Sequence, residues 1–289
     1  MTVLSLFDGI SCGKVALERA GIPIDRYFAS EIDPYAIKVS KTQHPDIIHL
    51  GDVCNIKGED LPKIDLLIGG SPCQGFSNAG KGKNFEDPRS RLFWEFVRLL
   101  EECKPKYFLL ENVVMKKEWS DIISAALGVE PIMIDSALVS PAKRRRFYWT
   151  NIPDVGQPED RHITFGDIRE RGVPEGHDYY TEKGLAWIDR HAKRTGKKLR
   201  IIQDHDIMQM LEATMHKKYS SQRFFGIEGT HGLRYITVKE SERCMGLPDD
   251  YTACCSNTQR YKQLGNGWEV NTVAHIFRNL KKTEDDPPS

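Results

Sequence analysis

The chain has 289 residues, 39% of them hydrophobic and 28% charged, and its 41 lysines and arginines balance its 41 aspartates and glutamates. This length can form one sizeable core and a smaller lobe, while zero net charge excludes any argument for a polyanionic partner from overall charge, so such a partner must be held by local basic patches. No apolar run approaches the roughly 18 residues of a membrane span, and the start MTVLSLFDGI lacks the features of a secretory signal. We expect a cytoplasmic protein with no membrane partner.

The first half of the chain alternates short apolar segments with amphipathic ones, a pattern typical of parallel strands joined by crossover helices. Helices are predicted after the first strand, from Pro34, and over residues 90–103, where Leu92, Phe96 and Leu99 share one face. Short links and right-handed crossovers favour an open, doubly wound α/β sheet. Its strands are predicted at residues 2–7, 25–33, 47–53, 64–70, 107–113, 131–139 and 145–151.

Near Asn151 this alternation ends. Residues 152–235 are polar, contain six of the nine histidines and carry a basic stretch at 190–200, which suits a smaller lobe that reads a substrate. Beyond Ile236 helical patterns return, and the last of them, at 268–280, is amphipathic and expected to pack on the sheet. The predicted segments are 1–151 for the catalytic and cofactor-binding domain, 152–235 for the substrate-reading lobe and 236–289 for the return to the catalytic domain.

The seven cysteines form no recognisable metal or disulfide pattern. None belongs to a Cys-x-x-Cys or Cys-x-x-His pair, and an odd number argues against a complete disulfide framework. We therefore expect free thiols and no metal.

Ligands of open parallel sheets bind beyond the carboxyl ends of the strands. The first predicted strand ends in FDGISCG, where Gly9 lets the backbone approach a ligand and the following helix offers free amides. Glu31 ends the second strand and suits two ribose hydroxyls, and Asp52 ends the third and suits the exocyclic amine of adenine. The alternatives are a structural glycine turn and solvated carboxylates. Three such endings together indicate a nucleoside cofactor.

The fourth predicted strand ends in GGSPCQGFS, residues 69–77. Pro72 has no amide hydrogen to donate and stiffens the chain, so the strand must stop and Cys73 should project from a loop rather than into the core. A free cysteine, considered alone, is more often an inert buried residue. A thiol that projects into a cleft is instead placed for nucleophilic attack.

Polar side chains also mark the next strands. Glu111 ends an apolar strand, where an unpaired carboxylate would be costly. Three arginines follow at residues 144–146; a solvated basic turn is the alternative, but strand alternation would direct Arg144 and Arg146 to one face. A thiol, a carboxyl group and two guanidinium groups would then converge.

These motifs resemble, in their order, those of the cytosine carbon-5 DNA methyltransferases. The matching segments are FDGISCG, the acidic Glu31, GDV, GGSPCQGFS, ENV, the R-x-R of residues 144–146 and QLGNGWEVNTV, and together they span nearly the whole chain. VLSLFDGI, DRYFASE, IGGSPC, RLFWEFVRLL and ENVV most resemble the catalytic domain of the de novo branch. The first motif starts at residue 3 without that branch's large reader domains, and Gln74 looks bacterial, so the chain resembles a compact bacterial or phage-encoded form.

The resemblance implies a Rossmann-like, S-adenosylmethionine-dependent fold with a small target recognition domain, and an enzyme of DNA methylation and restriction-modification. In the family a cysteine thiolate adds to carbon 6 of cytosine, and carbon 5 then takes the methyl group. Cys73 matches this nucleophile, and Glu111 matches the glutamate that hydrogen-bonds the base. Arg146, with Arg144 in support, matches the arginines that contact the base and its phosphate. Cations there would lower the thiol pKa from about 8.5.

By the same resemblance the cofactor is S-adenosylmethionine and the product S-adenosylhomocysteine. The matched cofactor residues are Phe7, Asp8, Gly9 and Ile10 for the methionine part, Glu31 for the ribose with Ile32 beside it, Asp52 and Val53 for the adenine, Pro72 beside the ring, and Asn266 and Trp268 near the carboxy terminus.

Residues 152–235 match the position of the family's target recognition domain, so the expected partner is double-stranded DNA, from which the cytosine is flipped out. A surface charge run is usually only solvated, which is the alternative for the basic residues. We expect a monomer or weak homo-oligomer, because Phe93 and Trp94, which resemble interface positions of the de novo branch, are explained by a helix core. The candidate DNA contacts are Lys193, Arg194, Lys197 and Lys198 for phosphates, Gln222 and Arg223 for bases, and Ser77 in a loop that resembles the family's mobile catalytic loop.

Three other functions share part of this pattern. A tRNA cytosine-5 methyltransferase would use the same chemistry, but that branch carries a Cys-Phe-Thr tripeptide that is absent here. A non-catalytic accessory subunit conflicts with the presence of Cys73, Glu111 and Arg146. A nicotinamide-dependent oxidoreductase would need a G-x-G-x-x-G turn, which the first strand lacks.

Overall fold

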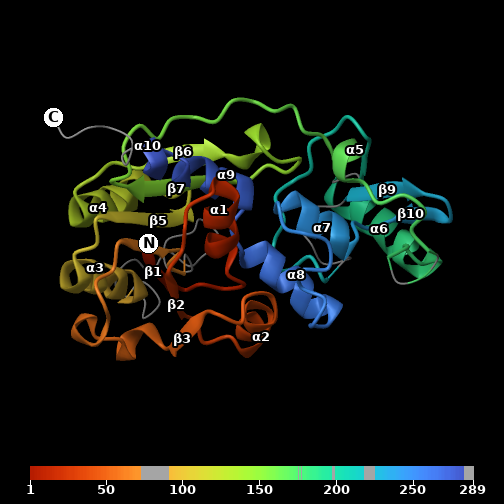
Figure 1. Ribbon diagram of the computed structural model, residues 1–289. Coiled ribbons are helices and arrows are strands. Elements are labelled where there is room, and N and C mark those ends of the chain that lie inside the picture. The colour runs from red at the N-terminus through yellow and green to blue at the C-terminus, as the bar shows by residue number, and fades with distance from the viewer. Residues whose placement is uncertain (73–90, 175, 177, 197–198, 218–224, 283–289) are drawn as a thin grey trace. The chain divides into compact units, whose positions relative to one another are not determined.

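The computed structural model describes residues 1–72, 91–174, 176, 178–196, 199–217 and 225–282 (Figure 1). The chain forms two compact units. The first comprises residues 1–135, 145–158 and 270–289, and the second comprises residues 136–144 and 159–269. Within the described residues, no helix has both the length and the apolar character needed to cross a membrane.

The first unit is built on a seven-stranded sheet with the strand order β3-β2-β1-β4-β5-β7-β6. The strands β1 to β5 run parallel, whereas β7 is antiparallel to both β5 and β6. The order of the strands reverses between β1 and β4, which is where an open α/β sheet binds its ligand. The strands are β1 Thr2–Leu6, β2 Arg26–Ser30, β3 Ile48–Gly51, β4 Leu66–Gly69, β5 Tyr107–Val113, β6 Ile132–Asp135 and β7 Arg145–Thr150.

The helices of this unit start and stop at residues that suit those positions. Asp33 caps α2 by accepting hydrogen bonds from the amides of Tyr35 and Ala36, and Pro34 occupies the first helical position. Gly21 ends α1 with a left-handed backbone. α9 packs along α1, and Arg19 donates a hydrogen bond of 2.8 Å to Asn271. The helices are α1 Cys12–Ala20, α2 Pro34–Gln43, α3 Arg91–Cys103, α4 Lys117–Leu127, α9 Val270–Phe277 and α10 Asn279–Lys282.

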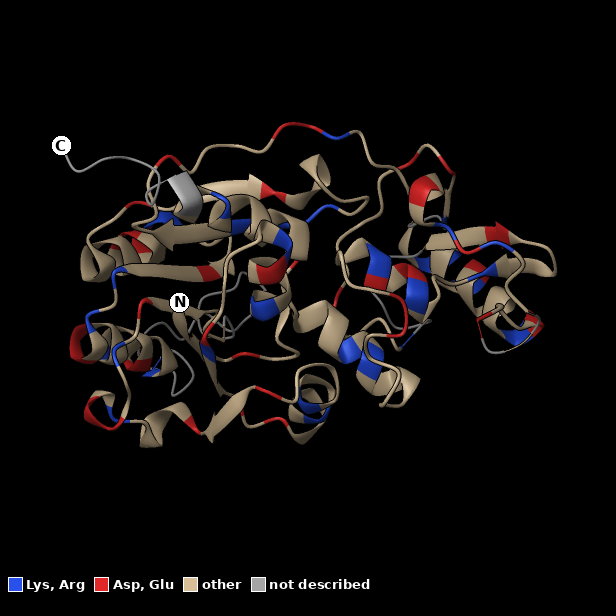
Figure 2. Ribbon diagram, viewed as in Figure 1, with Lys and Arg blue, Asp and Glu red and all other residues tan. Residues whose placement is uncertain are grey.

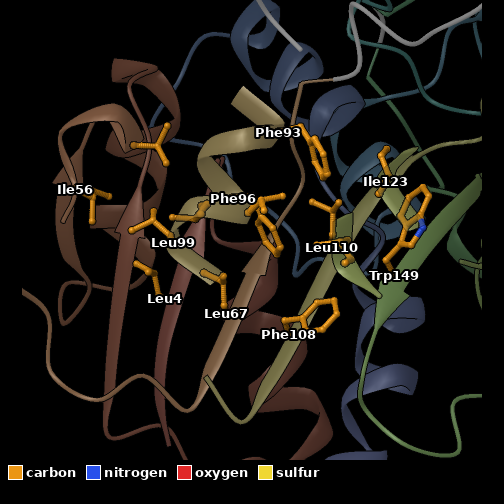
Figure 3. Packing of buried hydrophobic residues seen from close by; sticks show 14 of the residues in the cluster. Leu4, Ile56, Leu67, Phe93, Phe96, Leu99, Phe108, Leu110, Ile123 and Trp149 are labelled. Atoms are coloured by element: carbon orange, nitrogen blue, oxygen red, sulfur yellow. The ribbon is translucent and has the colours of Figure 1, made fainter. Parts of the chain in front are cut away.

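The core of the first unit joins α3 to the sheet (Figure 3). Phe93, Phe96 and Leu99 of α3 are fully buried against strand residues such as Leu67. Burial of each such side chain stabilises the fold by about 2–3 kcal/mol. A Cβ atom on Gly69 would lie 3.0 Å from the ring of Phe96, so this glycine lets α3 lie close to the end of β4.

The predicted strands agree with the sheet except near residue 136. The strand expected at 131–139 ends at Asp135 as β6, and a 3₁₀ turn follows at Ser136–Leu138. The Ser136 amide and hydroxyl each donate to the carbonyl oxygen of Arg144 at 3.2 Å, which closes residues 136–144 into a hairpin-like excursion of the second unit. The helix expected at 268–280 begins later, at Val270, and is divided into α9 and α10.

The second unit consists of short elements, as its polar sequence suggests. A three-stranded sheet has the order β10-β9-β8. Residues 236–269 belong to this second unit. They were expected to belong to the segment 236–289 that returns to the catalytic domain. The Tyr261 hydroxyl, for example, donates to the Ile236 carbonyl at 2.6 Å. The elements are α5 Phe165–Ile168, α6 Glu182–Thr195, β8 Arg200–Ile202, β9 Phe225–Gly229, β10 Gly232–Arg234, α7 Val238–Cys244 and α8 Asn257–Asn266.

Candidate active site

The register of the sheet aligns the last residues of β1, β2 and β4 in one row with Leu110 of β5, which itself continues to Val113. Leu6 pairs with Ser30 on one side and with Gly69 on the other, and Gly69 pairs with Leu110. Because the strands are parallel, the residue after each member of the row lies at the same edge of the sheet. These next residues are Phe7, Glu31, Gly70 and Glu111.

The loop after β1 has an unusual backbone. Phe7, Gly9 and Ser11 all have positive φ angles, of 57°, 59° and 62°. Such angles are strained for the two residues that are not glycine. A Cβ atom on Gly9 would meet nothing within 4 Å, so the space beside this loop is open. Ile10 is buried beneath it.

Glu31 is held by backbone amides at the end of β2. One carboxylate oxygen accepts a hydrogen bond from the Gly9 amide at 2.8 Å, and the other accepts from the amides of Ile32 and Asp33 at 2.8 Å each. The carboxylate is therefore fixed in position before any ligand arrives. The neighbouring Ile32 side chain is 70% exposed, which leaves an apolar surface for a ligand to cover.

Asp52 follows Gly51, which pairs with Ser30 at the row of strand ends. One of its carboxylate oxygens accepts from the Cys54 amide at 2.9 Å and caps the 3₁₀ turn that contains the buried Val53. The aspartate predicted to meet adenine thus also orders its own turn.

Glu111 and Arg146 form an ion pair on neighbouring strands. A carboxylate oxygen of Glu111 lies 2.8 Å from Nε of Arg146, and the two side chains are 11% and 10% exposed. Arg146 lies opposite Val113 in the antiparallel β5–β7 pair. The structure therefore brings together two of the predicted catalytic side chains.

Asn112 was not predicted as a site residue, yet it joins this strand to the segment before the cysteine. Its side-chain amide donates to the hydroxyl of Ser71 at 3.1 Å and to the Ser71 carbonyl at 3.3 Å. Both residues are buried. The next residue, Pro72, is half-buried, and Cys73 lies outside the described residues. The only sequence signal for this anchor was an amide side chain in an apolar strand, beside Glu111.

The structure corrects the expectation that Arg144 and Arg146 alternate along one strand. β7 begins at Arg145, and Arg144 belongs to the second unit. There its guanidinium group donates to the carbonyls of Gly267 at 2.6 Å, Gly265 at 3.3 Å and Leu211 at 3.4 Å. Arg144 therefore holds a glycine turn, and its role toward a base stays a prediction.

That glycine turn carries the two predicted carboxy-terminal cofactor residues. Asn266 is exposed at the end of α8 and Trp268 is half-buried after it. A Cβ atom on Gly265 would lie 2.1 Å from the Ala213 amide nitrogen, so only glycine allows this approach of two backbones. Both side chains remain predicted cofactor contacts.

The predicted DNA contacts are described only in part. The second unit carries both basic and acidic residues (Figure 2). Lys193 and Arg194 are exposed in the last turn of α6, where cations complement the helix dipole. The ring of Trp187 stacks on His191 at 4.9 Å along the same helix. The remaining candidates, Ser77, Lys197, Lys198, Gln222 and Arg223, lie outside the described residues.

Asp8, in the loop after β1, is an acid with a raised pKa. Its carboxylate accepts from the Tyr27 hydroxyl at 2.7 Å and from the Ser11 hydroxyl at 2.5 Å. Burial raises the pKa of Asp8 from 3.8 to about 6, against the opposite effect of these hydrogen bonds. An acid with such a pKa titrates close to neutral pH.

Comparison with known proteins identifies this arrangement. A family model described as C-5 cytosine-specific DNA methylase matches residues 1–118 and 150–282. The chain belongs to this family. It is therefore a methyltransferase that acts on carbon 5 of cytosine in DNA, as the motifs predicted, and the family generally uses S-adenosylmethionine.

Individual relatives agree. The type II methyltransferase M1.ScrFI of Lactococcus lactis subsp. cremoris is 31% identical over 307 residues, covering 96% of this chain and 77% of that protein. The orphan methyltransferase M.SPRI of Bacillus phage SPR is 45% identical over 188 residues, covering 60% of this chain and 43% of that protein. The structure of the Entamoeba histolytica methyltransferase EhMeth covers 99% of each chain with a TM-score of 0.82 at 17% identity, which confirms the Rossmann-like fold.

Proposed function

We propose that this methyltransferase acts on a cytosine flipped out of duplex DNA, through a transient bond between carbon 6 of the base and the sulfur of Cys73. The observation that carries the proposal is the row of strand ends. Glu31 and Glu111 each follow a member of this row, and Asn112 ties Ser71, two residues before Cys73, to the same edge. This arrangement supports a cofactor site and a base site that both lie at the carboxyl ends of the parallel strands.

The residues at this edge fit S-adenosylmethionine. The space beside Gly9 is open, which allows the methionine part of the cofactor to lie against the backbone of this loop. The exposed side chain of Ile32 offers an apolar surface, and the fixed Glu31 carboxylate suits the ribose hydroxyls. When bound, the cofactor supplies the methyl group. Phe7, Asp8 and Asp52 are proposed as its further contacts.

The base chemistry follows from the side chains of this chain. The Cys73 thiolate forms a bond to carbon 6, the displaced electron pair makes carbon 5 nucleophilic, and carbon 5 takes the methyl group. Glu111 hydrogen-bonds the amino group and ring nitrogen 3 as charge develops there, and Arg146 orients Glu111 through their 2.8 Å contact. Loss of the carbon-5 proton then returns the electron pair to the ring and releases the thiol.

The second unit is proposed to read duplex DNA. Extrusion of a cytosine costs a few kcal/mol, about the strength of several phosphate and base contacts. Lys193 and Arg194 on α6 are exposed and suit phosphates. We propose a monomer or weak homo-oligomer as the working form.

A covalent trap tests the proposal. Bisulfite sequencing of DNA from cells that express the protein first identifies the methylated site. A duplex with 5-fluorocytosine at that site, incubated with protein and methyl donor, should then yield an adduct that survives denaturation, because fluorine cannot leave as the proton does. Cys73→Ala should yield none, whereas Cys254→Ala should behave like the unmodified protein. An adduct with Cys73→Ala, or none with the unmodified protein, contradicts the proposal.

Transfer of a tritium-labelled methyl group distinguishes DNA from RNA as the substrate. The label should pass from the cofactor to duplex DNA and not to transfer RNA. Counts on RNA alone would contradict the choice of duplex DNA while leaving the covalent chemistry intact.

A further inference from the structure

A chain of buried hydroxyl groups extends from the loop of residues 7–11, which we call the cofactor loop, to neighbouring elements of the first unit. Asp8 accepts hydrogen bonds from Tyr27 and Ser11, and the Ser11 hydroxyl oxygen lies 2.7 Å from that of Ser40 in α2. The Ser40 oxygen lies 3.4 Å from Nε2 of His49 in β3. Ser11, Tyr27 and Ser40 are at most 1% exposed. The chain thus connects β2, the loop, α2 and β3.

The direction of the hydrogen bonds is set by the charge of Asp8. An ionised carboxylate can only accept, so Tyr27 and Ser11 both donate to it. The single Ser11 proton is then used, and the Ser40 hydroxyl must donate to the Ser11 oxygen. Ser40 can in turn accept from His49 in the tautomer that carries its proton on Nε2. All the hydroxyl groups therefore point toward Asp8 only while Asp8 is ionised.

A proton on Asp8 breaks this order. The protonated carboxyl group must itself donate: if it donates to Ser11, the Ser11 hydroxyl turns to Ser40 and the hydrogen bonds beyond it reverse, and if it donates to Tyr27, the phenol hydrogen loses its acceptor. An unsatisfied buried hydroxyl is unfavourable, and the network must rearrange.

The network bears on the cofactor because it holds a strained loop. Phe7 and Ser11 keep left-handed φ angles on either side of Asp8, a conformation that persists only where surrounding contacts enforce it. The Asp8 amide donates to the Ser30 carbonyl at 3.0 Å, and the Ser11 amide donates to the Asp8 carbonyl at 3.1 Å. The side-chain bonds from Tyr27 and Ser11 add the contacts that fix the carboxyl end of Asp8.

We propose that Tyr27 is a positioning residue for the cofactor loop: its hydroxyl keeps Asp8 ionised and residues 7–11 in the shape that binds the cofactor, so that cofactor affinity is lost when Asp8 takes up a proton. The inference rests on the proposed cofactor contacts of this loop.

The groups around Asp8 determine the sign of the effect. Burial raises its pKa most, and the charge of Glu31 raises it further, whereas hydrogen bonds from Ser11, Ser5 and Tyr27 lower it. The other charged and titratable groups facing the network are Lys14 of α1, 6.0 Å from the Tyr27 ring centre and paired with Asp46, and His49 at the far end. Removal of the Tyr27 hydroxyl therefore raises the pKa of Asp8 above about 6, and the loss of affinity on acidification must begin at higher pH.

Calorimetric titration with S-adenosylhomocysteine between about pH 5 and pH 9 tests this. The unmodified protein should lose affinity below the Asp8 pKa by up to about tenfold per pH unit, the limit for one proton. Tyr27→Phe should match it within about twofold near pH 8.5 but bind about two- to fivefold more weakly near pH 6, because loss of one hydrogen bond moves the pKa by about half to one unit.

Three further variants make the test specific. Asp8→Asn should bind with little dependence on pH relative to the unmodified protein. Ser40→Ala removes the donor to Ser11 and should move the curve in the same direction by less, which provides a second probe if Tyr27→Phe does not fold. Tyr180→Phe is the matched control, because it removes another buried tyrosine hydrogen bond, 2.9 Å to the Phe225 carbonyl of the second unit, and should leave the pH curve unchanged.

A measurement without cofactor separates this inference from the proposed function. The carboxyl carbon of Asp8, followed by carbon-13 NMR, should titrate near pH 6 and at higher pH in Tyr27→Phe. If it does so but S-adenosylhomocysteine does not bind, the proposed cofactor site is wrong and the network stands. If the ligand binds with the same pH curve in Tyr27→Phe and the unmodified protein, the positioning role of Tyr27 is overturned.

Discussion

Two glutamate–arginine pairs, one taken from each unit, differ in burial. In the first unit Glu111 and Arg146 lie at the edge of the sheet, 11% and 10% exposed, with a 2.8 Å contact through Nε. In the second unit Arg234 and Glu240 are 1% and 0% exposed. Arg234 donates through both terminal nitrogens, at 2.7 and 2.8 Å.

The inner pair, Arg234 and Glu240, also makes hydrogen bonds to the backbone. Glu240 also accepts from the amides of Glu170 and Thr237 at 2.9 Å each, and Arg234 donates to the Tyr235 carbonyl at 3.0 Å. These hydrogen bonds connect β10 to the start of α7. We therefore expect the inner pair to stabilise the fold and not to bind a substrate. We propose that the outer pair, Glu111 and Arg146, serves the chemistry, whereas the inner pair, Arg234 and Glu240, serves the structure; their burial differs accordingly.

The largest expected effect separates activity from stability at the outer pair. Glu111→Gln keeps the shape but replaces the carboxyl group that we propose hydrogen-bonds the amino group and ring nitrogen 3 with a non-acidic amide, so turnover should fall by about 10²- to 10⁴-fold. Methyl transfer to duplex DNA measures this, with S-adenosylhomocysteine affinity as the check that the protein is folded. Glu118→Gln, an exposed glutamate at the start of α4, is the control. Retained turnover in Glu111→Gln would remove the functional half of the comparison.

The inner pair should show the opposite behaviour. Glu240→Gln leaves the buried Arg234 charge uncompensated, which should reduce the free energy of unfolding by about 3–5 kcal/mol. Urea unfolding measures the loss. Asp121→Asn breaks the exposed pair with Lys117, whose side chains are 50% and 85% exposed, and should leave the free energy of unfolding nearly unchanged. Equal losses in the two variants would show that burial does not separate the pairs.

These contrasts indicate how far the sequence alone leads. The apolar runs before Glu31 and Asp52 predicted the ends of β2 and β3, because strands and their termination are local properties of the sequence, whereas β5 continues past Glu111 to Val113. The Glu111–Arg146 contact also followed, since both residues were expected near one edge.

The partners of Arg144 did not follow from the sequence. Its hydrogen bonds reach carbonyls 67, 121 and 123 residues away, and backbone carbonyls carry no sequence signal. The Asn112–Ser71 anchor was missed for the same reason, being 41 residues apart. Tertiary hydrogen bonds to backbone thus limit the prediction more than secondary structure does.

A third acid–base pair sharpens the comparison, because one partner can lose its charge. His44 lies 3.8 Å from Glu18 in the first unit, but burial lowers the pKa of His44 from 6.5 to about 4. The charge of Lys14 acts in the same direction and that of Asp46 against it. The geometry alone suggests an ion pair, whereas the buried imidazole stays neutral near pH 7.

The pH dependence of stability tests this third pair. In the unfolded chain His44 becomes protonated below about pH 6.5, whereas in the folded chain it becomes protonated only near pH 4. The contribution of His44 to the free energy of unfolding is therefore lost as the pH falls from 6.5 to about 4. Between about pH 8 and pH 5 the loss should be about 2 kcal/mol. His44→Gln should remove this pH dependence of the free energy of unfolding, measured by urea unfolding. His162→Gln should not, because the His162 side chain is 85% exposed.

Asp8 contributes in the opposite direction, since its raised pKa lowers stability as the pH rises through about 6. The difference between His44→Gln and the unmodified protein therefore isolates the contribution of the histidine. A slope unchanged by His44→Gln would mean that the imidazole is charged in the folded protein and pairs with Glu18 after all.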